Sequence, residues 1–102
     1  MADGTLMHIQ ALLEGKTVRF RPHGNSMVPI VHSGQLVTVE PLLGRKPEVG
    51  NAVLCKVNGR HMLHKVIAVG SDGRFQIGNN HGHIKGWCKI DNVYGILTAV
   101  EP

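Results

Sequence analysis

One stretch decides the fold class of this chain: AVLCKVNGRHMLHKVIAV, residues 52–69. It contains two runs of strand-forming residues, Ala52–Val57 and His61–Val69, on either side of the dipeptide Asn58-Gly59. Both residues of this dipeptide tolerate the positive φ that a two-residue hairpin turn requires. The stretch therefore predicts two antiparallel strands joined by a tight turn.

Further short strands are expected on both sides of this hairpin. The chain holds 13 glycines and 5 prolines in 102 residues, and such frequent turn residues favour many short strands over long helices. Ser71-Asp72-Gly73 is expected to form a second tight turn, and residues 42–50 an exposed loop. The additional strands, recognised by alternating apolar and polar residues, are expected at 17–21, 35–40, 74–77 and 93–100.

Residues 1–15 are expected to form one short helix ahead of the strands. Thr5 can cap its first turn, and Gly15 stands where helices commonly end. Its apolar face, at spacings i, i+3 and i+7, is expected to consist of Leu6, Ile9 and Leu13. The chain, residues 1–102, then reads as a single domain that is mainly β: a small twisted sheet or partly open barrel with one short N-terminal helix.

Composition narrows the classes of function. Hydrophobic residues make up 42% and charged residues 18%, which is typical of a globular domain. Since no apolar run approaches the roughly 20 residues that span a bilayer, and residues 1–14 do not resemble a secretory signal, we expect no membrane anchor and a cytoplasmic protein. The net charge of +4 comes from scattered residues, so nucleic-acid binding is not expected. Cys55 and Cys88 are expected to be reduced and buried.

A serine lies in an unusual segment between two expected strands, Gly24-Asn25-Ser26-Met27-Val28-Pro29. Gly24 permits a tight loop that exposes the Ser26 hydroxyl, and backbone N–H groups nearby can face an oxyanion. A serine acts as a nucleophile only when a base takes its proton, and a histidine or a desolvated lysine can do so. His64 and Lys65, adjacent on an expected strand, are the candidates. Because His64 shares a strand face with apolar residues, a hydrogen-bonded core histidine is the alternative interpretation.

The order and spacing of several short segments resemble the LexA/signal-peptidase family of serine peptidases. That family shows Gly-x-Ser-Met-x-Pro, two strands that begin with Gly-Asp, a basic pair before Val-Ile, and then Gly-Asp-Asn. The resemblance covers about residues 17–100 and implies a sheet or barrel of that family's type. The segments that carry it are Gly24–Pro29, Gly34–Val39, Val49–Leu54, His64–Ile67, Gly78–Asn80 and a final strand that begins near Tyr94.

The resemblance also implies a role for each matching residue. Ser26 would be the nucleophile, and His64, the first residue of the basic pair, would be the general base of a Ser-His site. Lys65 matches the second, arginine residue of that pair, and it would be the reserve base if His64 points away. The residues that support the nucleophile and the oxyanion would be Gly24, Asn25, Met27 and Asn79. The family's chemistry needs no metal and no other cofactor.

The chain departs from the family pattern at three acids. Gln35, Asn51 and Asn79 stand where the family has Asp after Gly. The amides of Gln35 and Asn51 can still hydrogen-bond a turn. At Asn79 the change bears on catalysis, because Ser-His relatives use an acid from that region to orient the imidazole. The resemblance therefore implies either a slow enzyme or a protein that has lost turnover.

Two further groups of histidines offer alternatives. His81 and His83 with Cys88, and with His61 as a further candidate ligand, have the chemistry of zinc ligands, but their spacing is not diagnostic. We expect instead a polar, glycine-rich loop that exposes both histidines. His23 and His32 flank the serine loop, and surface positions are expected for both.

The expected function is that of a serine endopeptidase that acts on an extended peptide of another chain. Such a peptide would add as a strand beside the site, with small side chains near the scissile bond. The competing hypothesis is a peptide- or protein-binding module of the same fold without turnover. A basic accessory protein for nucleic acid is a third hypothesis, which rests on charge alone. The sequence leaves the oligomeric state open.

Overall fold

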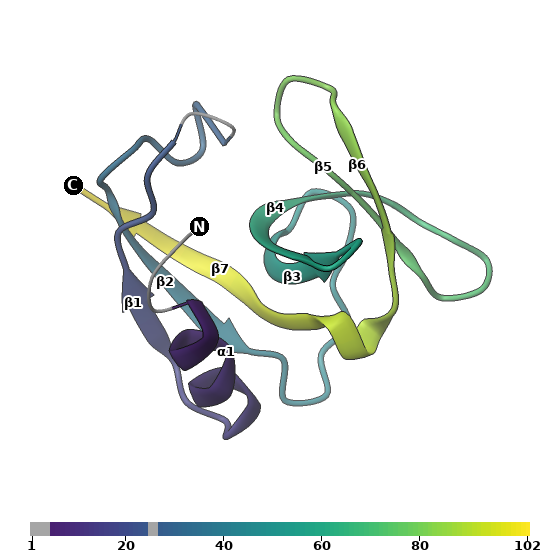
Figure 1. The fold of residues 1–102 in the computed structure, drawn as a ribbon, viewed down its shortest axis with the longest axis horizontal. Coiled ribbons are helices and arrows are strands. Elements are labelled where there is room, and N and C mark those ends of the chain that lie inside the picture. Colours follow the sequence, from purple (N-terminus) through teal and green to yellow (C-terminus); the bar gives the residue numbers. More distant parts are fainter. Residues whose placement is uncertain (1–4, 25–26) are drawn as a thin grey trace.

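A computed structural model describes residues 5–24 and 27–102 of the chain, and within these ranges one antiparallel sheet of seven strands forms with one α-helix (Figure 1). The strand order across the sheet is β1-β2-β7-β3-β4-β5-β6, so β1 and β6 are its open edges. The prediction of a mainly β fold with one short helix is confirmed. The elements are α1 (Thr5–Leu13), β1 (Val18–Phe20), β2 (Leu36–Pro41), β3 (Ala52–Val57), β4 (Arg60–Val69), β5 (Phe75–Gly78), β6 (Ile84–Cys88), a 3₁₀ turn η1 (Ile90–Asn92) and β7 (Val93–Glu101).

The hairpin expected at Asn58-Gly59 joins β3 to β4. Asn58 has φ of 50° and Gly59 has φ of 80°, which is the backbone of a two-residue turn with positive φ at both positions. The register follows directly from the turn, with Val57 opposite Arg60 and Leu54 opposite Leu63. The turn sequence therefore fixes which residues of β3 and β4 share a face.

The strand β7 crosses the middle of the molecule (Figure 1) and pairs with β2 on one side and β3 on the other. Both faces of β3 are buried. Leu54 belongs to an apolar cluster with α1, β1 and β2, whereas Val53 and Cys55 belong to a second cluster with β5 and β6. Since successive side chains of a strand point to opposite faces, the two clusters lie on opposite faces of β3.

The helix α1 lies where it was expected, and Ile9 is buried as predicted, but the other two residues predicted for its buried face are exposed. Leu6 and Leu13 are each 69% exposed, and the residues that face the sheet are Thr5, Ile9 and Leu12. Residues spaced i, i+4 and i+7 share one face of a helix just as residues spaced i, i+3 and i+7 do. Which of the two faces is buried therefore depends on how the helix packs against the sheet. At Gly95 of β7 an added Cβ would lie 2.7 Å from the Glu40 carbonyl oxygen and from Val39 Cγ1 and 3.1 Å from Leu12 Cδ2, so the missing side chain lets β2 and Leu12 pack closely there.

The strand β6 was not expected, because residues around His81 and His83 were interpreted as a polar loop. Only residues 79–83 form the turn, and Ile84–Cys88 then pairs with β5, with Phe75 opposite Cys88. The strand is an edge of the sheet and four of its five residues are not buried. An edge strand needs only one hydrogen-bonded neighbour and little apolar burial, so its residues do not show the alternation of a half-buried strand.

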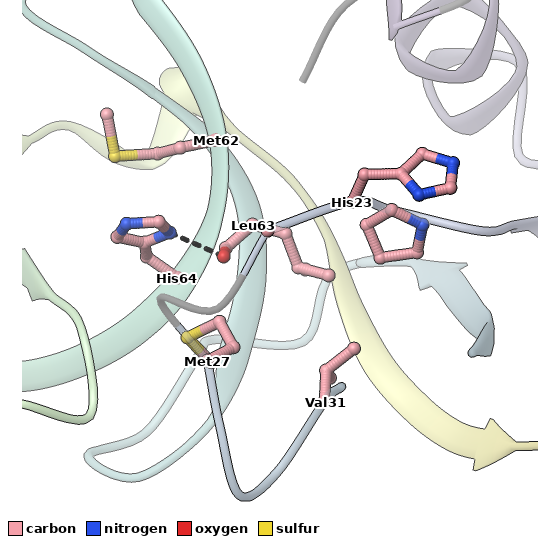
Figure 2. Close-up of a pocket in the computed structure, with 8 residues that line it drawn as sticks. His23, Met27, Val31, Met62, Leu63 and His64 are labelled. Atoms are coloured by element: carbon pink, nitrogen blue, oxygen red, sulfur yellow. Dashed lines mark hydrogen bonds between the residues drawn. The ribbon is translucent and has the colours of Figure 1, made fainter. Parts of the chain in front are cut away.

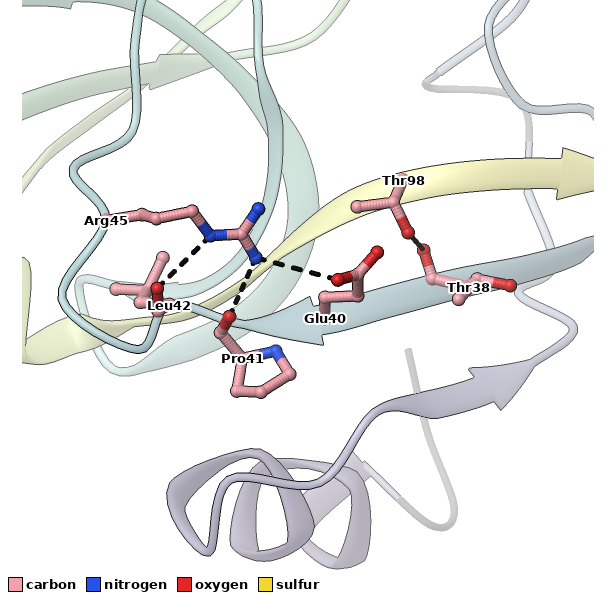
Figure 3. Close-up of polar contacts among 6 residues, drawn as sticks. All are labelled: Thr38, Glu40, Pro41, Leu42, Arg45 and Thr98. Carbon is pink, nitrogen blue, oxygen red and sulfur yellow. Dashed lines mark hydrogen bonds and ion pairs between the residues drawn. The ribbon is translucent and has the colours of Figure 1, made fainter.

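The loop after β2 is exposed, as expected, and one arginine ties it to the strand (Figure 3). The Arg45 guanidinium donates to the carbonyl oxygen of Pro41 at 2.9 Å and to that of Leu42 at 3.2 Å. A longer contact of 3.9 Å joins it to the Glu40 carboxylate. Most of what Arg45 contributes is therefore hydrogen bonding to backbone oxygens at the end of β2. No helix among the described residues is long and apolar enough to cross a membrane.

Candidate active site

A pocket of about 90 Å³, partly open to solvent, lies between the β1–β2 loop and the strand β4 (Figure 2). The loop contributes residues on both sides of the Asn25-Ser26 dipeptide, and β4 contributes three consecutive residues. Its wall is mostly apolar, with two histidines. The lining residues are Pro22, His23, Gly24, Met27, Val31, Met62, Leu63 and His64.

The proposed nucleophile Ser26 and its neighbour Asn25 lie outside the described residues, so their roles stay predictions. The residues on either side of them in the chain, Gly24 and Met27, line the same pocket as His64. The fold thus brings together segments that stand far apart in the sequence. Lys65 is not among the lining residues that the structure describes; it lies opposite Ala52 and Gly78 in the sheet.

His64 is held in one tautomer by its own strand. Its side chain is 8% exposed, and its Nδ1 lies 2.5 Å from the carbonyl oxygen of Leu63 (Figure 2). A carbonyl oxygen can only accept a hydrogen bond, so Nδ1 carries the proton and donates it. In the neutral ring the lone pair then resides on Nε2, which is the atom a general base uses.

The environment of His64 favours the neutral ring. Burial lowers the pKa of His64 below its ordinary value, and the positive charge of Lys85 acts in the same direction. The hydrogen bond to the Leu63 carbonyl opposes them, because an imidazolium would donate it more strongly. The balance is a lowered pKa, so His64 is unprotonated and able to accept a proton at neutral pH.

The chain is anchored on both sides of Asn25-Ser26. Before the dipeptide, the Gly24 N–H donates to Ser33 Oγ at 3.2 Å. After it, the Met27 carbonyl oxygen accepts two hydrogen bonds, from the Val31 N–H at 2.8 Å and from Asn80 Nδ2 at 3.0 Å. The Met27 side chain is 5% exposed within the core. Two of these hydrogen bonds brace the β1–β2 loop internally, and the bond from Asn80 together with the buried Met27 side chain holds it against the rest of the molecule.

The three amides that replace acids of the resembled family all accept backbone hydrogen bonds. Gln35 Oε1 accepts from the His32 N–H at 2.7 Å, and Asn51 Oδ1 accepts from the Glu48 N–H at 2.7 Å. Asn79 Oδ1 accepts from the N–H groups of His81 and His83, at 2.8 and 3.1 Å. An amide oxygen is a good acceptor, so the change from acid to amide keeps these turns.

Asn79 is therefore a loop-forming residue in the described structure. Its side chain is 6% exposed, and its described hydrogen bonds go to its own loop, including a 3.4 Å contact between Asn79 Nδ2 and His83 Nδ1. The residue of this loop that reaches the serine segment is the next one, Asn80. Sequence reasoning quoted Asn80 within the Gly78–Asn80 motif but gave it no role.

The zinc alternative finds no geometry to support it among the described residues. No group of three or more His, Cys, Asp or Glu side chains within 5–24 and 27–102 is placed to hold a metal ion. His81 and His83 are exposed, while Cys88 is buried in the same apolar cluster as the buried Cys55. Both cysteines are free thiols, as expected.

The other residues that sequence reasoning missed are Met62 and Val31 in the pocket wall and the Leu63 carbonyl at His64. The last of these carries no signal in a sequence, because every residue has a carbonyl. Of the flanking histidines, His23 lines the pocket and is exposed, and His32 is exposed outside the wall.

In comparisons with known proteins, no family model and no curated protein sequence matches the chain.

Proposed function

We propose that this chain is a serine peptidase of the LexA/signal-peptidase type that cleaves an extended peptide of another chain. Ser26 is the nucleophile and His64 is the general base. The observation that carries the proposal is the contact between His64 Nδ1 and the Leu63 carbonyl, which leaves Nε2 as the proton acceptor of a histidine that lines the same pocket as the neighbours of Ser26.

The proposed reaction proceeds through an acyl-enzyme. Ser26 Oγ attacks the scissile carbonyl carbon while its proton passes to His64 Nε2, and backbone N–H groups beside Ser26 hold the oxyanion. His64 then gives that proton to the leaving amine, which leaves as the C–N bond breaks. A water molecule next attacks the ester, again with His64 as base, and the peptide acid and free Ser26 are regenerated.

The Leu63 carbonyl takes the orienting part that an acid plays in a triad. It fixes the ring and the tautomer, as a carboxylate would. It carries no net charge, so it stabilises the imidazolium formed during the reaction less than a carboxylate does. We therefore expect a slower enzyme than a Ser-His-Asp peptidase rather than an inactive one.

The competing function, a peptide-binding module without turnover, is favoured by one observation. Among the described residues that line the pocket there is no carboxylate, and the Asn79 amide is engaged by its own loop. The apolar wall formed by Met27, Val31 and Met62 would suit a peptide side chain whether or not a bond is cut.

The deciding experiment exposes a diverse peptide mixture to the purified protein and maps new termini by mass spectrometry. Ser26→Ala and His64→Ala proteins are run beside it, with His61→Ala as a matched control, since His61 is a half-buried histidine of the same strand outside the pocket lining. We expect cuts by the wild type and by His61→Ala, and none by the other two.

Two other outcomes would change the proposal. Loss of cutting in Lys65→Ala, with cutting retained in His64→Ala, would move the base to Lys65. If the folded wild-type protein retains peptides but produces no new termini, the binding-module function is the correct one.

A further inference from the structure

Asn80 connects two parts of the molecule that are distant in sequence. Its Nδ2 donates to the carbonyl oxygen of Met27 over a separation of 53 residues, and the bond is partly shielded from solvent. Met27 is the residue that follows Ser26 in the chain. The β5–β6 turn is therefore tied directly to the segment that carries the proposed nucleophile.

The turn that carries Asn80 is well fixed. Asn79 closes it by accepting from the N–H groups of His81 and His83, and its own N–H donates to the His83 carbonyl at 3.0 Å. Gly78 also lies close to this turn, where an added Cβ would be 2.8 Å from the His83 carbonyl oxygen. Asn80 thus projects from a rigid support, with Asn79 building the turn and Asn80 making the contact.

The chemistry of the contact requires an amide donor. The Met27 carbonyl oxygen can only accept, so the Asn80 side chain must present its NH₂ group and not its oxygen. A carboxylate in its place could not donate and would repel the carbonyl oxygen. An asparagine meets the need of this position, and an aspartate does not.

We propose that Asn80 is a positioning residue for Ser26, an inference that rests on the proposed function. Together with the Val31 N–H, it holds the Met27 carbonyl in one direction. With the Met27 side chain buried, the backbone after Ser26 is then fixed relative to β4, which carries His64. Asn80 acts through Met27 and does not itself touch the substrate.

The test follows the rate at which a fluorophosphonate probe labels Ser26. In this reaction Ser26 Oγ forms a bond to phosphorus, the P–F bond breaks, fluoride leaves, and the hydroxyl proton passes to His64 Nε2. The variants are Asn80→Ala and Asn80→Asp, read by intact mass and by mapping of the labelled peptide. The matched control is Asn58→Asp, since Asn58 Nδ2 donates to the Lys85 carbonyl at 3.4 Å outside the pocket lining.

We expect labelling of Asn80→Ala to slow by about 10- to 100-fold, as small displacements of a reacting group can do. Asn80→Asp should slow more, because repulsion is added to the lost bond. The pH at which the Asn80→Ala rate reaches half of its maximum should match that of the wild type, since His64 and Leu63 are unchanged. Asn58→Asp should label within about twofold of the wild-type rate.

A second measurement separates positioning from a loss of fold. The Val31 N–H shares the Met27 acceptor, so its hydrogen exchange should rise in Asn80→Ala while exchange in β3 stays as in the wild type. Wild-type labelling and Val31 exchange in Asn80→Ala would overturn the positioning role and leave the proposed function intact. A folded wild-type protein that neither labels at Ser26 nor cuts peptides would overturn both.

Discussion

His64 donates its Nδ1–H to the carbonyl oxygen of Leu63, the residue that precedes it in β4. The contact joins a buried titratable ring to a backbone group that cannot change its charge. It makes the ring's orientation independent of pH as long as the strand persists. It raises the pKa of the ring, but burial and the charge of Lys85 lower that pKa by more.

The lowered pKa of His64 predicts a loss of stability in mild acid. Below its ordinary value of 6.5, the unfolded chain binds a proton that the folded chain resists, so unfolding becomes more favourable as the pH falls. The contribution is fully present above that value and is lost progressively below it. We expect the wild-type melting temperature to fall between about pH 7.5 and 5.5 by more than that of His64→Gln.

The control for this pH effect is His61→Gln, which should keep the wild-type slope because it leaves His64 in place. The measurement is thermal unfolding by circular dichroism across the pH range. Equal slopes for the wild type and His64→Gln would contradict the assignment of the lowered pKa to His64.

The two leucines at the end of α1 should respond very differently to truncation. Leu12 is 3% exposed and Leu13 is 69% exposed. Leu12→Ala should cost about 2–4 kcal/mol of unfolding free energy, through lost burial and a cavity beside Gly95. Leu13→Ala should change it by less than about 0.5 kcal/mol. Urea denaturation measures both, and a larger effect at Leu13 would restore the face that the sequence predicted.

The thiols of Cys55 and Cys88 should be unreactive in the folded protein. Both are buried; the interaction with Cys88, together with burial, raises the pKa of the Cys55 thiol, whereas the interaction with Cys55 lowers the pKa of the Cys88 thiol, so Cys88 is protected by its burial alone. Since the thiolate is the reactive form, iodoacetamide at mildly alkaline pH should alkylate both cysteines in urea and neither in native buffer. Rapid alkylation of either thiol in native buffer would show that the β3–β6 contact opens readily.

Arg45 should stabilise the end of β2 through backbone hydrogen bonds rather than through its ion pair. Arg45→Ala removes donors to the Pro41 and Leu42 carbonyls and should cost about 1–2 kcal/mol. Glu40→Gln removes only an exposed contact of 3.9 Å and should cost less than about 0.5 kcal/mol. Chemical denaturation of the two variants compares these costs, and equal losses would identify the ion pair as the main contribution.

Much of the fold could be predicted because the signals are local. Asn58-Gly59 specifies a turn through the φ angles that these residues tolerate, and its register then follows. The strand β6 could not be predicted in the same way, since an exposed edge has no apolar alternation to reveal it. The buried face of α1 was ambiguous because both stripes fit a helix, and packing against the sheet buries Leu12 in place of Leu13.

In the candidate site, too, local sequence signals could be recognised and features that depend on tertiary packing could not. The short segments around Gly24, Met27 and His64 were found from the sequence, and the fold places these three residues in one pocket. The contacts that orient the residues of this pocket leave no clear signal in the sequence. The Leu63 carbonyl is a backbone group with no signature, and the Asn80 bond to Met27 depends on how the β5–β6 turn approaches the loop.

The central position of β7 has a consequence for how the protein is made. A ribosome delivers β2 and β3 well before β7, the strand that pairs with both. During that interval each of the two strands lacks the neighbour it has in the finished sheet, and unpaired strand edges can recruit other chains. The nascent protein is thus exposed to misassembly until residues 93–101 leave the exit tunnel. In that interval β7 of a second copy could pair with the open edges of β2 and β3.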